Sequence, residues 1–438
     1  MSLPGPTAVP VLLAAAGASW EAAAVERLDR RGAGTVLHRR CVDLPDLLAA
    51  ARTGLSPVAV VAAGLPGLDA DAVSVLRGSG VQVVAVLGPG DSAGDGPSAE
   101  ERLRRLGVLR CLDADLEGLE EAVRAAAAGP APEDQDDLLA ADAVEADASG
   151  AGGGGRLVAV WGPAGAPGRT TVAVSMAAEL ADRGLTTLLV DADPYGGAVA
   201  QHLGVLDEVS GLLAAARTAN AGRLDATALA QACRSVGDRL RLLTGLPRAD
   251  RWVEVRPAAF EELLGQARQL ADRVVVDVGF SLEEDGDPFA AAPRRNGMTL
   301  DALEQADDLV VVGSADPVGL ARLARALVEV AERCPDLPTV VAVNRIRPSL
   351  GWAEQDVRGM VEGFHRHARV RFLPEDRETA DRALMAGRSV VELGDSPLRR
   401  AVAAVVDALA GSAAGSAAGR PVSSRPRRLR SRRAGRAR

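Results

Sequence analysis

The amino-acid sequence predicts an α/β protein with two domains, and three observations support this prediction. The chain of 438 residues is too long for one hydrophobic core. Apolar runs of strand length alternate with amphipathic runs of helix length, which is the pattern of a parallel sheet covered by helices on both faces. Acidic and glycine-rich stretches then divide the chain into a domain at 1–129, a linker at 130–155, a domain at 156–410 and a flexible tail at 411–438.

The first domain begins with the apolar run VPVLLAAA at 9–16. We interpret this run as a strand rather than a secretion signal, because no basic residue precedes it. AAAVERLDRRG follows as a helix, and PVAVVAAG at 57–64 and VQVVAVLG at 81–88 are further buried strands. LEGLEEAVRAAAA at 116–128 closes the domain as a helix.

The turn LPGLD at 65–69 resembles one in the response-regulator receiver domain, which has a flavodoxin-like fold. Receivers carry an acceptor aspartate four residues before this proline, and here Ala62 stands in that position. Receivers also carry paired acids after the first strand, where residues 14–17 read AAAG. The resemblance therefore implies a pseudo-receiver that docks or dimerises without phosphorylation. An unrelated small flavodoxin-like domain is the alternative.

The second domain opens with a strand, LVAVW, a Gly/Pro-rich loop and a helix that starts around Thr170 and Thr171. Glycines let backbone N–H groups turn inward and a helix N-terminus adds positive potential, so this context is typical of a phosphate-binding loop. Later apolar strands end in Asp191 and Asp193 and in Asp277. Carboxylates at strand ends beside such a loop can hold Mg²⁺ and an attacking water.

These elements resemble, in order and spacing, the deviant-Walker ATPases of the MinD/ParA superfamily. That family's loop reads K-G-G-x-G-K-T-T, where residues 164–171 read AGAPGRTT. The segments QHLGVLDEVSGLLAAAR, VVAVNRIRP at 340–348 and LPEDRETADRALMAGRSVVELGDSPLRRAV at 373–402 are similar to the CpaE-like branch, which includes TadZ and septum-site determining proteins. The resemblance implies a receiver-like domain followed by a P-loop domain with a mostly parallel sheet covered by helices on both faces.

The resemblance also implies ATP and Mg²⁺ as cofactors and gives individual residues roles around them. Gly165 and Gly168 would shape the loop, and Arg169, Thr170 and Thr171 would contact the nucleotide, whose adenine edge Asn344 would read. Thr170 and Asp277 would hold the metal. Arg169 would act in catalysis together with Asp193, which would orient the attacking water. Asp191 would support the same site.

Several positions depart from the family pattern. Arg169 replaces the lysine that bridges the β- and γ-phosphates, and Ala164 replaces the signature lysine that reaches the partner's nucleotide in a dimer. Gly197 replaces an asparagine, and Pro167 removes one backbone donor. All 50 basic residues are arginine, so a compositional bias accounts for Arg169 but not for Ala164. Together the departures predict weak or absent hydrolysis.

Composition excludes other classes of protein. The four cysteines are widely spaced and form no C-x-x-C pair, which argues against a structural metal and fits a reducing cytoplasm. No apolar run approaches the roughly 20 residues of a membrane span. The tail from 420 to 438 holds nine arginines and no acid, so it either contacts anionic lipid or DNA or is merely solvated. The apolar helix SPLRRAVAAVVDALAG before it is expected to belong to the core.

Three functions follow from these expectations. We favour a scaffold that places a pilus or secretion machine or the division septum, with polar or septal assembly proteins as partners and a homodimer as a further possibility. An active ATPase switch of the MinD type and a ParA-like nucleoid-binding partition protein are the alternatives. The expected location is the cytoplasm, at the membrane or the cell pole if the tail binds there.

Overall fold

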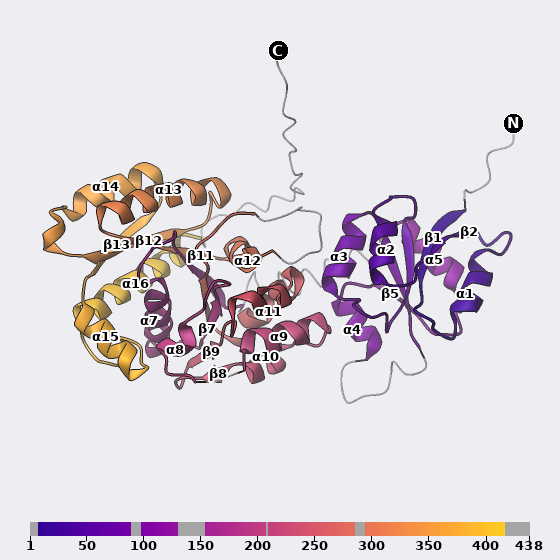
Figure 1. Ribbon diagram of the computed structural model, residues 1–438, viewed down its shortest axis with the longest axis horizontal. Coiled ribbons are helices and arrows are strands. Elements are labelled where there is room, and N and C mark those ends of the chain that lie inside the picture. The colour runs from indigo at the N-terminus through magenta and orange to yellow at the C-terminus, as the bar shows by residue number, and fades with distance from the viewer. Residues whose placement is uncertain (1–7, 89–97, 130–153, 207–208, 285–293, 417–438) are drawn as a thin grey trace, which may run out of the picture.

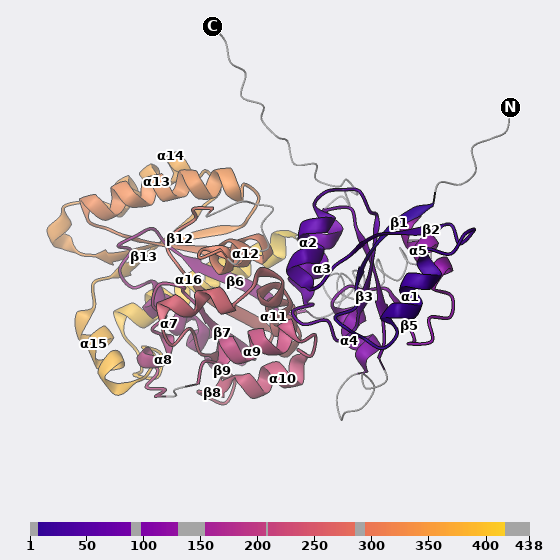
Figure 2. The same ribbon diagram turned by 45° about the vertical axis from the view of Figure 1, so that its right-hand side comes forward.

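The computed structural model describes residues 8–88, 98–129, 154–206, 209–284 and 294–416. These residues form two α/β domains that lie side by side in both Figure 1 and Figure 2. Most of the expected linker and the whole arginine-rich segment at 420–438 lie outside the described residues. No helix in the described part of the chain is long and apolar enough to cross a membrane.

The N-terminal domain is built on a five-stranded parallel sheet with the strand order β2-β1-β3-β4-β5. The strands are β1 Val9–Ala14, β2 Thr35–Arg40, β3 Val58–Ala62, β4 Gln82–Val86 and β5 Arg110–Leu112. The helices are α1 Glu21–Leu28, α2 Leu44–Ala51, α3 Ala70–Gly78, α4 Ala99–Arg105 and α5 Leu119–Ala127. Every residue of β3 is buried, because helices cover both faces of the sheet.

The apolar runs of the sequence do not reveal β2, whose sequence is TVLHRR. This strand lies at the edge of the sheet and only its first residue is buried. An edge strand needs few apolar residues, so no continuous apolar run marks it.

The second domain is built on an eight-stranded sheet with the order β13-β12-β11-β6-β10-β7-β9-β8. All neighbouring strands are parallel except β8 and β9. The strands are β6 Arg156–Trp161, β7 Thr187–Ala192, β8 Arg234–Ser235, β9 Leu240–Leu243, β10 Arg273–Val278, β11 Asp308–Ser314, β12 Thr339–Ile346 and β13 Arg369–Pro374.

Helices cover both faces of this sheet, and each face has its own hydrophobic core. One core includes residues from α9 Gly211–Asn220, α10 Ala226–Ala232, α11 Pro257–Leu270, α12 Gly297–Gln305, α13 Pro317–Arg333 and α14 Glu354–Phe364. The other includes residues from α7 Arg169–Asp182, α8 Val199–His202, α15 Arg377–Ala386 and α16 Pro397–Ser416. Two short 3-10 helices, Ala249–Glu254 and Pro348–Leu350, complete the domain. The predicted mostly parallel sheet with helices on both faces is confirmed.

Both boundaries of this domain differ from the expected ones. Gly155, expected in a loose linker, is buried, and its N–H donates to the Arg268 carbonyl at 2.7 Å. A Cβ there would overlap the Ala271 carbonyl oxygen, so the position requires glycine. Helix α16 contains the expected apolar core residues, but it continues through Gly411 to Ser416, where the sequence suggests a flexible joint. Alanine has the highest helix propensity, so an Ala-rich segment readily extends a helix that is already packed.

The two domains meet where α3 contacts α11. Asp69 caps α3 by accepting the Ala72 N–H at 2.9 Å, and its other oxygen accepts from Arg256. Asp71 Oδ1 accepts the Ala258 N–H at 3.0 Å, in the first turn of α11. Burial raises the pKa of Asp71 above its usual range. The contact therefore joins acids at the start of α3 to the positive end of α11.

Candidate functional site

The loop at residues 162–168 connects β6 to α7 and has the geometry of a phosphate loop. Gly165 and Gly168 have φ angles of 73° and 88°, a left-handed conformation that favours glycine. Each is also crowded by a polar side chain: a Cβ on Gly165 would overlap the guanidinium of Arg322, and one on Gly168 would overlap the amide of Asn344. Backbone conformation and close approach thus both require glycine at these positions.

Arg169 is the first residue of α7, and its side chain turns back into the loop. Its Nη1 donates to the Gly162 carbonyl at 3.2 Å and its Nη2 to Asp193 Oδ2 at 2.8 Å. Its Nε lies 3.9 Å from Asp277 Oδ1. The side chain is only 13% exposed. The guanidinium thus lies across the base of the loop, between the two carboxylates.

Asp277 lies at the end of β10 and is fully buried. Thr170 Oγ1 donates to Asp277 Oδ2 at 2.7 Å. Burial raises the pKa of Asp277 to about 6, although the positive charge of Arg169 and the Thr170 hydrogen bond both oppose the rise. Asp193 follows β7, and its Oδ1 accepts the Tyr195 N–H at 2.9 Å. The structure thus brings together four residues that the sequence assigns to catalysis and metal binding.

Asp191 points into the same region from the end of β7 but bonds to backbone. Its carboxylate accepts the Val199 N–H at 3.1 Å and the Asp193 N–H at 3.5 Å. Burial raises its pKa to about 8, and the negative charge of Asp277 adds to the effect. A structural role for Asp191, holding the turn after β7, is consistent with these contacts.

Two glycines pack against the Asp191 carboxyl group. A Cβ on Gly197 or on Gly245 would lie within 3 Å of its atoms. The glycine that replaces the family's asparagine is therefore part of the packing around Asp191, which the sequence pattern does not indicate.

Asn344 contacts the phosphate loop. Its Nδ2 donates to the Pro167 carbonyl at 2.8 Å, and its Oδ1 accepts the Arg345 N–H at 2.9 Å. A cavity of about 400 Å³ opens beside it, against the first turn of α7, and its lining includes Gly168, Thr171, Asn344, Pro374 and Asp376. Asn344, which is expected to read the adenine edge, thus borders a cavity beside the phosphate loop. Its Oδ1 already accepts a hydrogen bond from the chain itself.

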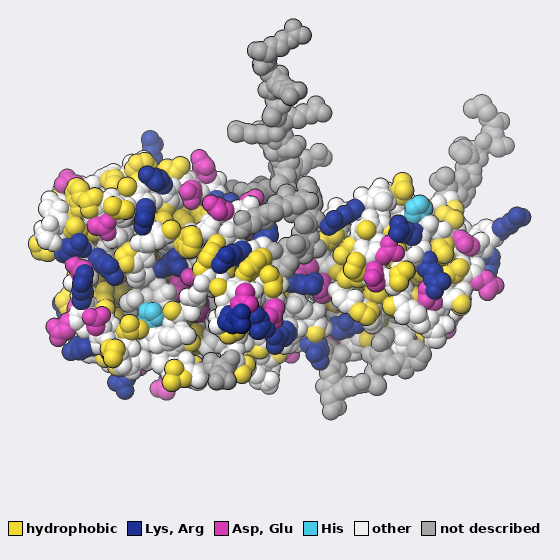
Figure 3. Space-filling model, viewed as in Figure 1, with side chains coloured by type: hydrophobic (Ala, Val, Ile, Leu, Met, Phe, Trp, Pro, Cys, Tyr) yellow, Lys and Arg dark blue, Asp and Glu magenta, His cyan; other side chains and the backbone are white. Residues whose placement is uncertain are grey.

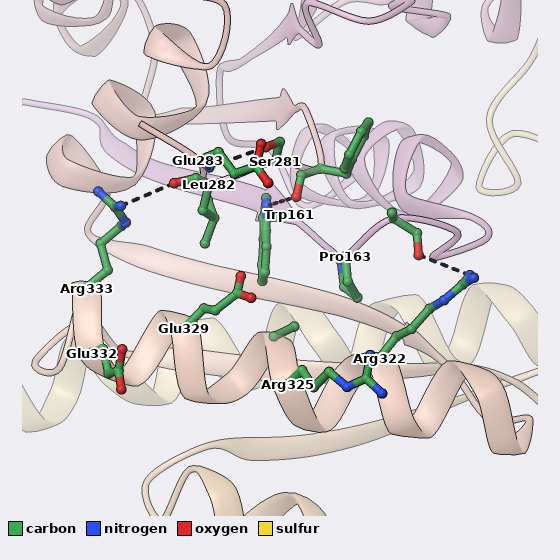
Figure 4. A pocket seen from close by; sticks show the side chains of 13 residues that line it. Trp161, Pro163, Ser281, Leu282, Glu283, Arg322, Arg325, Glu329, Glu332 and Arg333 are labelled. Carbon is green, nitrogen blue, oxygen red and sulfur yellow. Dashed lines mark hydrogen bonds between the residues drawn. The ribbon is translucent and has the colours of Figure 1, made fainter. Parts of the chain in front are cut away.

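Arg322 is a residue of the site that sequence reasoning missed. It extends from α13 toward the loop and its Nη1 donates to the Ala164 carbonyl at 3.3 Å, as Figure 4 shows. It borders a cavity of about 580 Å³ whose lining includes Trp161, Pro163, Arg325, Glu329 and Arg333. Ala164 has no charge, so Arg322 supplies a cation at the loop position where the family has its signature lysine. No local motif marks an arginine on a distant helix.

The residues do not fit a divalent metal as they lie. A metal at this site would need oxygen ligands from Thr170 and Asp277. Here the Thr170 hydroxyl donates directly to Asp277 Oδ2, and Arg169 pairs with Asp193 and lies 3.9 Å from Asp277 Oδ1. Asp277 Oδ1 and Arg169 Nε are both buried without a hydrogen-bond partner and face each other at 3.9 Å. No cluster of three or more potential metal ligands occurs among the described residues.

The phosphate-binding surface of the loop is retained in part. The first N–H groups of a helix have no acceptor within it, so the N-terminus of α7 offers donors at Arg169, Thr170 and Thr171. Pro167 offers none, and the Ala166 N–H is used within the loop, on the Pro163 carbonyl at 3.0 Å. These backbone groups can bind an anion, while Arg169 beneath them is already paired with Asp193.

Comparisons with known proteins found similarity only at the level of solved structures. No protein-family model matches the chain, and no curated protein matches it. The chain resembles a ParA family ATPase from Chlorobium tepidum TLS, with a TM-score of 0.48, 19% identity and coverage of 58% of this chain and 98% of that one. It also resembles the cell division ATPase MinD of Pyrococcus furiosus, with a TM-score of 0.48, 18% identity and coverage of 59% and 99%. A third similar structure is MinD from Pyrococcus horikoshii OT3 complexed with Mg-ADP, with a TM-score of 0.46, 16% identity and coverage of 59% and 97%.

Proposed function

We propose that this chain is a positioning protein of the MinD/ParA superfamily, of the CpaE-like branch, that acts as a scaffold with little or no ATP hydrolysis. The observation that carries the proposal is the placement of Arg169. Its guanidinium pairs with Asp193 at 2.8 Å and lies 3.9 Å from Asp277. The two carboxylates that hydrolysis would need thereby share one guanidinium of the chain itself.

The loop supports weak nucleotide binding rather than turnover. Backbone donors at the start of α7 and the cavity beside Asn344 can accept a nucleotide without a metal. A planar guanidinium cannot replace the compact ammonium that follows a transferred phosphate. Positioned cations supply about 10³–10⁵ in the rate of phosphoryl transfer, so their loss alone accounts for an inactive enzyme.

The N-terminal domain supports the scaffold role as a pseudo-receiver. Its strand ends carry alanines at 14–16 and at Ala62, so they can neither hold Mg²⁺ nor accept a phosphoryl group. The domain is instead docked on α11 through α3. Its partners in this proposal are proteins of a polar or septal assembly, with dimerisation of the chain as a second means of assembly. The arginine tail, which lies outside the described residues, would attach the scaffold to anionic lipid or DNA.

The test is ATP hydrolysis by the full chain and by a variant that restores both lysines, Arg169→Lys with Ala164→Lys. We expect the unmodified protein to hydrolyse ATP near the detection limit, with a dimerisation state insensitive to ATP. The double variant should gain Mg²⁺-dependent turnover if the loop needs only its lysines. Arg382→Lys, at an exposed arginine on α15, is the matched control and should change nothing.

Two outcomes separate the proposal from its rivals. Robust Mg²⁺-dependent turnover by the unmodified protein, abolished by Asp193→Ala, would establish an active ATPase and overturn the scaffold. A double variant as inactive as the unmodified protein would indicate that the whole site has been lost, which agrees with a scaffold.

A further inference from the structure

A cavity of about 610 Å³ lies between the two domains. On one side it is lined by the segment 63–69, which follows β3, and by Arg102 of α4. The second domain contributes Arg217 and Asn220 at the end of α9, with Arg223 and Arg256. Arginine side chains are visible along the seam between the domains on the face shown in Figure 3. The volume falls in the range of about 300–1,000 Å³ typical of small-molecule sites.

The charge of the lining is strongly positive. Four arginines line the cavity, and Asp69 is the only acid among the described residues that do so. That carboxylate is already engaged by Arg256 and by the N-terminus of α3. Arg217 pairs with Glu254 at 2.9 Å, and Arg223 is exposed and forms no ion pair with any described residue. At least one guanidinium is therefore available to an incoming ligand.

The position of the cavity in the fold also favours a ligand. The lining segment 63–69 follows β3, so the cavity lies outside the carboxyl end of that strand. Open parallel sheets bind ligands outside the carboxyl ends of their strands. The same edge carries alanine at 14–16 and at Ala62, so no carboxylate there repels an anion.

We propose that this cavity binds a small molecule bearing a di- or triphosphate-type anion, held between the domains. Guanidinium groups bind phosphate oxygens with paired hydrogen bonds, and Arg217 and Arg223 stand on the side opposite the segment 63–69. A ligand in the cavity contacts both domains at once. It therefore binds the docked arrangement preferentially and stabilises the contact between α3 and α11.

The experiment is calorimetric titration of the full chain with inorganic pyrophosphate at low ionic strength. We expect saturable binding by the unmodified protein. Arg217→Gln with Arg223→Gln should weaken it about tenfold or more, because two charged donors to phosphate oxygens are lost. Arg382→Gln, at an exposed arginine outside the cavity that also forms no ion pair within the described part of the chain, should bind as the unmodified protein does. Hydrogen exchange at residues 69–72 and 256–258 should slow when pyrophosphate is present.

The phosphate loop could also bind pyrophosphate, and the variants distinguish the two sites. Binding that persists unchanged in the Arg217/Arg223 double variant would place the anion elsewhere and overturn the proposal. Absence of binding by the unmodified protein would also overturn it. If the double variant unfolds, Arg223→Gln alone serves, because that side chain has no ion pair to lose. The outcome is independent of ATP hydrolysis, so an active phosphate loop would leave this inference untouched.

Discussion

The two sheets of this protein differ in the side chains at the carboxyl ends of their strands. In the second domain the carboxyl ends of β7 and β10 deliver Asp191, Asp193 and Asp277 into a buried site, where Arg169 pairs with Asp193 and lies 3.9 Å from Asp277. In the N-terminal domain the carboxyl ends of β1 and β3 deliver only alanine and glycine. Both sheets are mostly parallel and covered by helices, and sheets of this kind bind ligands outside the carboxyl ends of their strands. The side chains at the strand ends decide which charges such a site can accept.

The largest effect should come from removing the internal counter-ion with Arg169→Met. Two buried carboxylates would lose their partner, and breaking a buried pair in this way costs about 3–5 kcal/mol in the free energy of unfolding. The loss should be greatest near pH 8 and smaller near pH 5, because Asp277, with a pKa of about 6, can then take up a proton. Chemical denaturation at the two pH values measures it.

Arg382→Met provides the control for this measurement. Its side chain is exposed, so the free energy of unfolding should change by no more than about 0.5 kcal/mol. A loss below about 1 kcal/mol in Arg169→Met would show that water already screens the carboxylates and would remove the contrast between the two edges.

A second prediction concerns the pH dependence of stability. The folded-state pKa values of Asp191 and Asp277 lie above their usual range, at about 8 and about 6. The folded protein therefore holds protons that the unfolded chain has released, and the free energy of unfolding should decrease as the pH rises from about 4 to about 8. Asp191→Asn should flatten most of this slope, since it removes the larger shift and can still accept the Val199 N–H. An unchanged slope would assign the proton uptake to other groups.

The smallest effect is expected at the other edge. Small acyl phosphate donors should leave residues 1–129 of the full chain unmodified, because Ala62 has no oxygen to accept a phosphoryl group. Ala62→Asp should remain unmodified as well, since no carboxylates at 14–16 hold Mg²⁺ beside it. Mass spectrometry measures the modification. Stoichiometric aspartyl phosphate in the unmodified protein would contradict the pseudo-receiver.

The parts of this fold that sequence reasoning predicts are those with a local signal. Continuous apolar runs identify β1, β3 and β4, and the glycines with the following threonines identify the loop before α7. Strand β2 has no such signal, because half of an edge strand faces solvent and its alternation is weak. Helix α16 passes through glycine and serine residues that favour a joint in isolation, since its packed N-terminal part has already met the cost of nucleation.

The sequence predicts which residues belong to the candidate site, but not all of the contacts between them. The strand ends place Asp193 and Asp277, and the first turn of α7 places Thr170 beside Asp277. The direction of the Arg169 side chain depends on its contacts with Asp193 and Asp277, which follow or end other strands of the sheet. The sequence around Arg169 therefore does not predict it. The contact of Arg322 with the loop is harder to predict, because the sequence of an amphipathic helix does not show which of its arginines reaches another segment.

The packing of Gly197 and Gly245 against Asp191 bears on how such a protein can change over evolutionary time. In the family that the sequence resembles, an asparagine often occupies the position of Gly197. An asparagine here would bring its Cβ against the Asp191 carboxyl group, so that side chain would have to turn aside to make room. A substitution at Gly197 is therefore coupled to the turn after β7, because the same carboxyl group accepts the Val199 N–H.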